Sequence, residues 1–202
     1  MKFTPDSEIT RQTIVESTAD LFNKKGYAGT FISDLTAATG LTKGGIYGNF
    51  KNKDDVAAAA LTYNIQRRAA IIDGKINTAS GYRAKLIAYV DLFSSRENKV
   101  FAPGGCPLMN MACEADDTLP HFMEPVSAEM ARWKNGLMEI ISDGISAKEF
   151  KANTNVEKTA LTIISLIEGS VLLGRILKSN HDRDLVLESI KDLIDYIANG
   201  SI

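Results

Sequence analysis

The sequence has few of the residues that mark secreted, metal-binding or membrane proteins. It contains 2 cysteines and 2 histidines among 202 residues, and these do not cluster at metal-ligand spacing, so no metal and no cofactor is predicted. The opening residues, MKFTPDSEITRQ, lack the apolar core of a secretory signal. The most apolar run, residues 160–177, is interrupted by Glu168 and Arg175, which argues against a membrane span. We therefore expect a cytoplasmic protein with free thiols and no membrane partner.

A strong excess of one charge is also absent, because the formal net charge is −2. Residues 1–53 carry 7 Lys and Arg against 5 Asp and Glu, which leaves 16 against 20 for residues 54–202. Residues 1–53 are too weakly basic to hold DNA by charge alone, so DNA binding there would require a fitting shape and two copies. The hydrophobic share of 45% is typical of a soluble globular protein.

Helical periodicity is the strongest pattern in the chain. Apolar residues recur every three or four positions, and Gly26 and Gly40 stand where helices would end. The segments predicted as helices are 6–25, 33–39, 42–50, 54–76, 80–98, 107 onward, 121–145, 156–178 and 182–198. We therefore predict an all-α protein with a helix-turn-helix domain over residues 1–53 and a second helical domain over residues 54–202.

Residues 30–53 read TFISDLTAATGLTKGGIYGNFKNK and predict two short helices joined by a glycine turn, which is a helix-turn-helix. In the second helix only Ile46 and Phe50 form an inward stripe. Gly44 and Gly45 each cost about 1 kcal/mol relative to alanine in a helix, so propensity would not select them, whereas close approach to a partner would. A recognition helix in the major groove of DNA needs such short side chains near base edges. The alternative is an ordinary helix pair in an all-α protein.

A set of residues at fixed offsets then suggests a family. These residues are Gly26-Tyr27, Thr30, Asp34-Leu35, Gly40-Leu41, Lys43-Gly44, Ile46-Tyr47, Phe50 and Lys53. They follow the pattern of the tetracycline-repressor (TetR) family of bacterial transcription regulators, and the resemblance covers residues 10–56. It implies an amino-terminal DNA-binding domain followed by a ligand-binding and dimerisation domain.

The resemblance also implies roles for single residues. Four residues would face the bases and backbone of the major groove: Thr42, Lys43, Gly44 and Gly45. Three others would hold phosphates: Thr30, Tyr47 and Lys53. The sequence departs from the family at Gly45, where Ser or Thr is frequent, and at Gly48-Asn49, where an aromatic residue and a histidine are common. Asn49 completes the candidate DNA-binding residues.

The segment after residue 102 combines chain breakers with soft apolar residues. Pro107 suits the first position of a helix, which places Cys106 at the N-cap, where unpaired backbone N–H groups favour a reactive thiolate. Cys106 is therefore either a sensor of oxidants or electrophiles, or a small, half-buried residue at a tight turn.

A candidate effector pocket follows from the next helical turns. Asn110, Cys113 and Glu114 share one helix face, which is either solvated or directed into a cavity with a few polar anchors among apolar side chains, as suits a small-molecule effector. The candidate ligand-binding residues are Tyr89, Phe93, Cys106, Asn110, Cys113, Glu114, Trp133 and Glu168.

The last two predicted helices carry more apolar surface than a single chain needs to bury. Packed against the same pair of a second chain, they would form a four-helix dimer interface, which the resemblance also implies; an intramolecular helix pair is the alternative. The candidate dimerisation residues are Ile163, Ile167, Ser170, Gly174, Val186, Ile190, Leu193 and Ile197.

These patterns predict a homodimeric DNA-binding transcriptional regulator, most often a repressor, that a small-molecule effector releases from a palindromic operator. One alternative is a DNA-binding redox or electrophile sensor that is switched by modification of Cys106. A cysteine-dependent helical enzyme is a remote alternative, because His121 and Glu114 form no recognised motif with that thiol. No catalytic residue is predicted.

Overall fold

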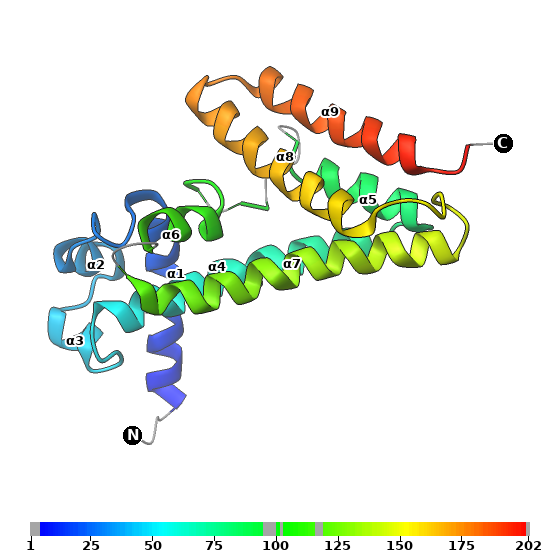
Figure 1. Cartoon of the computed structure of the whole chain (residues 1–202). Coiled ribbons are helices and arrows are strands. Elements are labelled where there is room, and N and C mark those ends of the chain that lie inside the picture. The colour runs from blue at the N-terminus through cyan, green and yellow to red at the C-terminus, as the bar shows by residue number, and fades with distance from the viewer. Residues whose placement is uncertain (1–4, 95–99, 102, 116–118, 201–202) are drawn as a thin grey trace. The chain divides into compact units, whose positions relative to one another are not determined.

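The computed structural model describes residues 5–94, 100–101, 103–115 and 119–200, which form the helices α1 to α9 (Figure 1). No strand occurs in these residues, and the β-type pairing among them is one isolated bridge between Phe150 and Ala198. The prediction of an all-α fold is confirmed.

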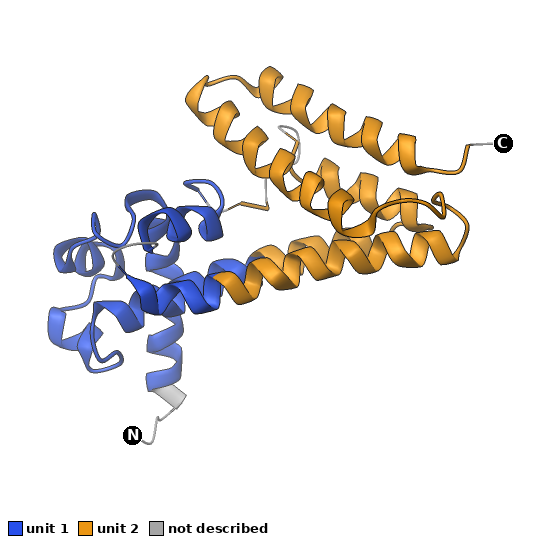
Figure 2. Cartoon of the chain, viewed as in Figure 1, with its two compact units in different colours: residues 1–67, 102–126 blue, residues 68–101, 127–202 orange. Residues whose placement is uncertain are grey.

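The chain divides into two compact units (Figure 2). Unit 1 contains residues 1–67 and 102–126, and unit 2 contains residues 68–101 and 127–202. These units do not follow the boundary predicted after Lys53, because a later helix pair packs with the helix-turn-helix.

Unit 1 is built from three amino-terminal helices, the beginnings of two long helices and one short helix between them. These are α1 (Pro5–Lys25), α2 (Ile32–Thr39), α3 (Lys43–Tyr47), the first part of α4 (Lys53–Ile76), α6 (Pro107–Ala115) and the first part of α7 (Pro120–Ser146).

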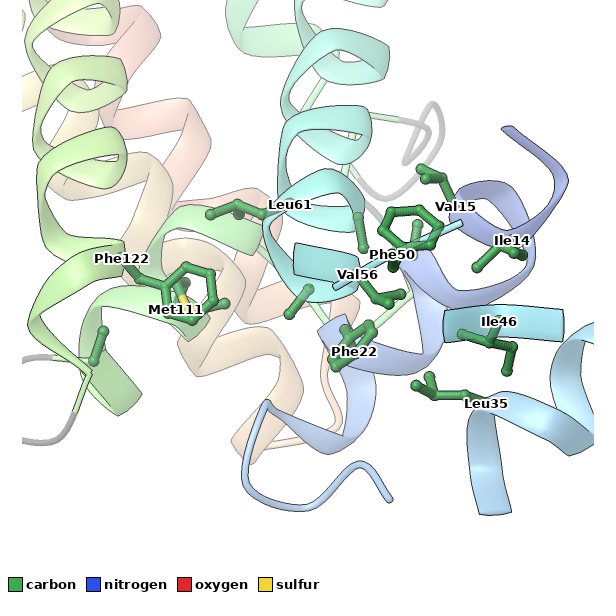
Figure 3. Close-up of a cluster of buried hydrophobic side chains, with 14 of the residues drawn as sticks. Ile14, Val15, Phe22, Leu35, Ile46, Phe50, Val56, Leu61, Met111 and Phe122 are labelled. Carbon is green, nitrogen blue, oxygen red and sulfur yellow. The ribbon is translucent and has the colours of Figure 1, made fainter. Parts of the chain in front are cut away.

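Apolar side chains from all of these helices meet in the core of unit 1 (Figure 3). Ile14 of α1, Leu35 of α2 and Ile46 of α3 are each 0% exposed, and each such burial contributes about 1.5–3 kcal/mol relative to exposure. Met111 and Phe122 join the same cluster from α6 and α7. The helix-turn-helix therefore shares its core with residues that lie far along the chain.

The ends of the short helices are defined locally. Gly26 and Gly40 have φ of 74° and 70°, the left-handed conformation that glycine adopts without a steric cost. Thr42 is the N-cap of α3, and its hydroxyl accepts a hydrogen bond from the Gly45 N–H at 3.1 Å. Helix α2 begins one residue earlier than predicted, with Phe31 as its N-cap.

Unit 2 contains the remaining parts of α4 and α7 together with α5 (Tyr82–Asp91), α8 (Val156–Ile176) and α9 (Asn180–Ile197). Helix α9 packs against both α8 and α5. Among the described helices, α8 alone has the length and composition of a membrane span. However, Ile163 and Ile167 of α8 are fully buried inside unit 2, as in a core helix of a globular protein.

Candidate functional site

Helix α3 separates its inward residues from the residues predicted to contact DNA. Ile46 is 0% exposed and Phe50 is 3% exposed. Thr42, Lys43 and Gly44 are exposed on the other side. The prediction of an inward stripe and a free outer face therefore agrees with the burial pattern of this helix.

The two adjacent glycines of α3 are not required by the fold. A Cβ at Gly44 would meet only the Thr42 hydroxyl at 3.8 Å, and a Cβ at Gly45 would meet Leu41 and Thr42 at 3.5 Å, which are ordinary contacts. Neither glycine has a positive φ. Since glycine disfavours a helix by about 1 kcal/mol relative to alanine, these positions keep a surface flat at a cost to stability.

Lys53 stabilises the turn between α1 and α2. Its ammonium donates hydrogen bonds to the carbonyl oxygens of Tyr27 at 2.8 Å and Thr30 at 3.0 Å, and it lies 3.9 Å from the centroid of the Tyr27 ring. An ammonium has three donors, so one remains for a phosphate. The Tyr27 hydroxyl donates to the Asp54 carboxylate. Burial and this hydrogen bond raise the pKa of Tyr27 to about 12.

Two side chains that were predicted to contact DNA form hydrogen bonds within the chain instead. Thr30 is 0% exposed, and its hydroxyl donates to the Gly26 carbonyl at 2.6 Å, so this side chain does not reach a phosphate. The Asn49 amide donates to the Gly45 carbonyl at 2.9 Å, which secures the end of α3. Tyr47 is partly buried against the core of unit 1.

Arg11 braces the same end of α3. Its guanidinium donates to the Asn49 carbonyl at 2.7 Å and stacks 3.9 Å from the centroid of the Phe50 ring. This residue therefore positions the predicted recognition helix from α1.

Glu114 of α6 holds the turn that follows α1. Its carboxylate accepts hydrogen bonds from the backbone N–H groups of Tyr27 and Ala28, both at 2.6 Å. Gly26 leaves room for this carboxylate, because a Cβ there would lie 2.7 Å from Glu114 Oε2. Sequence reasoning placed Glu114 in an effector pocket, whereas its oxygens are used by the backbone beside the helix-turn-helix.

Asn110 makes a similar internal connection one turn earlier. Its amide donates to the Asn23 carbonyl at 3.1 Å and to the Gly104 carbonyl at 3.0 Å. The cavity beside Asn110 and Glu114 measures about 20 Å³, which is enough for about one water molecule. The prediction that these two residues line an effector pocket is therefore corrected.

The remaining predicted pocket residues fall in different environments. Cys106 is 3% exposed directly before α6, and Cys113 is exposed. Phe93 is fully buried, and its ring packs 5.2 Å from those of Tyr89 and Phe101, measured between centroids. Only Tyr89 and Trp133 of the predicted set line the large cavity of unit 2.

That cavity has a volume of about 520 Å³ and lies between α4, α5 and α7, within the size range of small-molecule sites. Arg68 and Glu129, which also line it, were missed from the sequence. Both interrupt otherwise apolar helical stripes, Arg68 seven residues after Leu61 and Glu129 three residues after Val126. A charge within an inward stripe was the available signal.

Three polar side chains of the cavity lining are buried. Arg68, Tyr89 and Trp133 are 4%, 2% and 7% exposed, and the Arg68 guanidinium lies 3.9 Å from the centroid of the Trp133 ring. Burial raises the pKa of Tyr89, against a smaller opposite effect from the neighbouring Arg68 charge and Trp133. Glu168 of α8 is close enough to add to the rise, although it does not line the cavity.

The predicted dimer stripe is corrected, because most of it forms the core of unit 2. Five of its residues have exposed fractions between 0% and 4%: Ile163, Ile167, Ser170, Ile190 and Ile197. Gly174 faces α9, since a Cβ there would lie 2.9 Å from Arg183 Cβ. Val186 and Leu193 are partly buried.

Other side chains of α8, α9 and the turn between them form the apolar surface. We call them the outer apolar stripe: Leu161, Leu172, Leu173, Ile176, Leu177 and Leu185, with exposed fractions of 43–66%. A set of this size on two neighbouring helices is typical of a protein interface.

Comparisons with known proteins agree with this arrangement. Residues 14–60 match the family model of bacterial regulatory proteins of the tetR family, and residues 83–190 match that of a tetracyclin repressor-like C-terminal domain. The structure of a TetR-family transcriptional regulator from Cytophaga hutchinsonii is 42% identical, with a TM-score of 0.93 over 99% of this chain and 100% of that one.

Two further relatives are similar over nearly their whole length. The structure of a TetR transcriptional regulator from Chloroflexus aurantiacus J-10-FL is 33% identical and covers 98% of this chain and 100% of that chain, with a TM-score of 0.91. An uncharacterized HTH-type transcriptional regulator of Mycobacterium tuberculosis strain H37Rv is 28% identical over 191 residues, which are 91% of this chain and 93% of that protein.

Proposed function

The chain belongs to the TetR family of bacterial regulatory proteins and is a DNA-binding transcriptional regulator, and from this premise we propose that it is a cytoplasmic, homodimeric repressor released from a palindromic operator by a small-molecule effector. The observation that carries the proposal is the flat, exposed face of α3, which begins at the N-cap Thr42 and contains two glycines that the fold does not require. Short side chains at these positions let the helix backbone approach base edges in the major groove.

The test is a selection of genomic DNA fragments by the purified protein at two salt concentrations. The native protein should enrich one palindromic motif, and a Gly44→Ala, Gly45→Ala double variant should lose that enrichment. The same variant should be more stable to urea by about 1–2 kcal/mol, because alanine favours the helix. Opposite effects on stability and DNA binding would identify a recognition surface rather than a folding defect.

Lys43→Ala provides a second variant on the same face, and Lys24→Ala is its control, because both lysines are exposed and only Lys43 belongs to α3. We expect the Lys43 change alone to weaken selection. Equal motif enrichment by the native protein and the double glycine variant would contradict the assignment of α3 as the recognition helix.

The outer apolar stripe supports the proposed dimer. Leu172 and Ile176 are 57% and 66% exposed on α8, and burying them against a second copy removes this apolar area from water. A Leu172→Glu, Ile176→Glu variant should sediment as a monomer and bind the operator weakly. Ile9→Glu is the control, because Ile9 is 67% exposed on α1 and lies outside this stripe.

Helix α4 supports the proposed coupling between effector and operator. About two and a half turns of it, from Arg68 to Ile76, contribute to the wall of the 520 Å³ cavity, and the same helix begins at Lys53, directly after the helix-turn-helix. An effector that favours a different position of α4 would change the spacing of the two recognition helices. Its differential affinity for the two states needs to reach a few kcal/mol.

Covalent switching at Cys106 is the weaker variant of this proposal. The Cys106 side chain is 3% exposed, and Cys106 does not line the large cavity. An oxidant or electrophile would first require this segment to open. Reversible binding in the cavity needs no such step, so we favour it.

A further inference from the structure

The lining of the unit 2 cavity contains hydrogen-bond donors that have no partner among the described residues. Arg68 Nε and Nη2, Trp133 Nε1 and the Tyr89 hydroxyl form no hydrogen bond of acceptable geometry with any described residue. No carboxylate of the described residues accepts a hydrogen bond from Arg68 Nε or Nη2. Burying such donors without a partner is costly.

These donors face the same space. The guanidinium stacks on the Trp133 ring at 3.9 Å, and both Arg68 and Trp133 act on the ionisation of Tyr89, so the three groups are neighbours. An arginine offers a planar fork of donors that matches a carboxylate in two-point contact. The tyrosine and tryptophan add one donor each.

The rest of the cavity wall has a different character. Next to the donors it is apolar, with contributions from Ala69, Ile72, Ile76, Leu137 and Ile140. The volume of about 520 Å³ exceeds the needs of a small inorganic anion. The cavity therefore suits a molecule with an apolar body and one anionic end.

Other charges line the cavity and bear on this assignment. Glu129 is paired with Arg132 at 3.1 Å, which offsets its negative charge. Lys85 lies 4.9 Å from the centroid of the Tyr82 ring. The acidic groups Asp73, Glu139 and Asp143 are exposed at the rim, where solvent screens them.

We propose that the effector is an organic monocarboxylate whose carboxylate is bound by Arg68, Tyr89 and Trp133 and whose apolar body lies against α4 and α7. The inference rests on the proposed effector-released regulator, and it names the chemical class of the effector. Neutral molecules of the same shape leave the donors unpaired and bind more weakly.

The test compares three probes that share a phenylalkyl body and carry an anionic, a neutral and a cationic head group: 4-phenylbutyrate, 4-phenylbutanamide and 4-phenylbutylamine. Trp133 is the single tryptophan of the chain, so its fluorescence reports on this cavity directly, and calorimetry gives the affinities independently. The carboxylate should bind the full-length protein at least about tenfold more tightly than the amide, as expected for charge-assisted hydrogen bonds at a buried site. The amine should bind most weakly.

Two variants test the residues. Arg68→Met should reduce carboxylate affinity about tenfold or more and leave amide affinity unchanged, and Tyr89→Phe should reduce it by a smaller factor. Lys85→Met is the matched control, because it removes a positive charge from the same cavity without touching the donors. Tyr89→Phe removes a single oxygen, so it tests the site even if Arg68→Met fails to fold.

Each outcome bears on one inference. The carboxylate assignment would be overturned if the acid and the amide bound equally or if the amine bound more tightly. It would also be overturned if Lys85→Met lost as much carboxylate affinity as Arg68→Met, or if the folded protein bound no carboxylate at millimolar concentration. Operator selection is measured separately without a probe, so the regulator proposal can survive that result. Carboxylate binding with no effect on operator affinity would support the site and contradict its role in release.

Discussion

The polar residues of unit 1 and those of the unit 2 cavity are used in opposite ways. In unit 1 the Glu114 carboxylate, the Asn110 amide and the Lys53 ammonium each bond to two backbone groups of the chain itself. In the cavity, Arg68, Tyr89 and Trp133 are more deeply buried, and Arg68 Nε and Nη2, the Tyr89 hydroxyl and Trp133 Nε1 have no hydrogen-bond partner among the described residues. Burial alone therefore does not tell a structural polar group from a binding group.

The difference lies in hydrogen-bond satisfaction. A buried polar group with a partner is close to neutral for stability or favourable, whereas one without a partner costs about 1–3 kcal/mol. Unit 1 uses satisfied groups to fix the turn in front of the recognition helix. The cavity retains donors without hydrogen-bond partners, and a ligand can supply the missing acceptors. The substitutions below should show this contrast as differences in the free energy of unfolding.

Removing the Glu114 carboxylate should have the largest effect. In Glu114→Ala the Tyr27 and Ala28 N–H groups lose their acceptor, so the free energy of unfolding in urea should fall by about 2 kcal/mol. Operator binding should weaken with it, because the turn beside α2 is released. Glu124→Ala is the control, since Glu124 is exposed on α7 in the same unit. An unchanged unfolding free energy in Glu114→Ala would contradict a structural role.

Removing the unpaired cation should act in the other direction. Arg68→Met replaces a buried guanidinium with unpaired N–H groups by an apolar side chain, and the free energy of unfolding of the ligand-free protein should rise by about 1 kcal/mol. The gain is limited because the stacking of Arg68 on Trp133 is lost. Urea unfolding measures both variants, and a destabilised Arg68→Met would show that Arg68 is a structural residue like Glu114.

The two tyrosines provide a smaller, matched comparison. Tyr27→Phe removes a hydroxyl that donates to Asp54 and should lower the free energy of unfolding by about 1 kcal/mol. Tyr89→Phe removes a hydroxyl without a hydrogen-bond partner and should be neutral or slightly stabilising. Thermal unfolding at neutral pH distinguishes them, and equal losses in both variants would remove the contrast.

The raised pKa of Tyr27 adds a pH dependence to this pair. Its folded-state pKa is about 12, against 10.0 for the free side chain. Below pH 10 both states hold the proton, and between these values only the folded state holds it, so stability declines as the pH rises toward 12. The native protein should lose stability more steeply than Tyr27→Phe over this interval in urea titrations, and parallel curves would contradict the assignment.

Helix ends and buried helix faces could be predicted from the sequence, whereas the hydrogen-bond partners of polar side chains could not. Helix ends such as Gly26, Gly40 and Thr42 depend on local conformation, and the inward stripe of α3 depends on helical spacing, so both could be predicted. The partner of Glu114 could not, because it lies 86 and 87 residues away in the chain and its choice depends on how α6 packs. The spacing between Asn110 and Glu114 is the same whether their helix face contacts solvent, forms hydrogen bonds within the chain or lines a cavity, so it cannot distinguish these cases.

Helix α8 shows a second limit. Two apolar stripes run along it, and periodicity cannot say which one is buried inside its own chain. The predicted dimer stripe includes Ile163 and Ile167, which are fully buried in unit 2, whereas Leu172 and Ile176 remain exposed. The choice is made by contacts with α9, which also packs against α5, and these contacts are not visible in the pattern of either helix.

The smallest effect is expected at the cysteines, which test whether the satisfied network of unit 1 also protects a buried thiol. Iodoacetamide should alkylate Cys113, which is exposed, and spare Cys106, which is 3% exposed. Mass spectrometry after digestion should find one modified thiol per chain, with no change in unfolding free energy or operator affinity. Cys113→Ser should leave no reactive thiol in the folded protein. Modification of Cys106 with loss of operator binding would instead mean that unit 1 opens readily, and it would favour the covalent switch over reversible binding in the cavity.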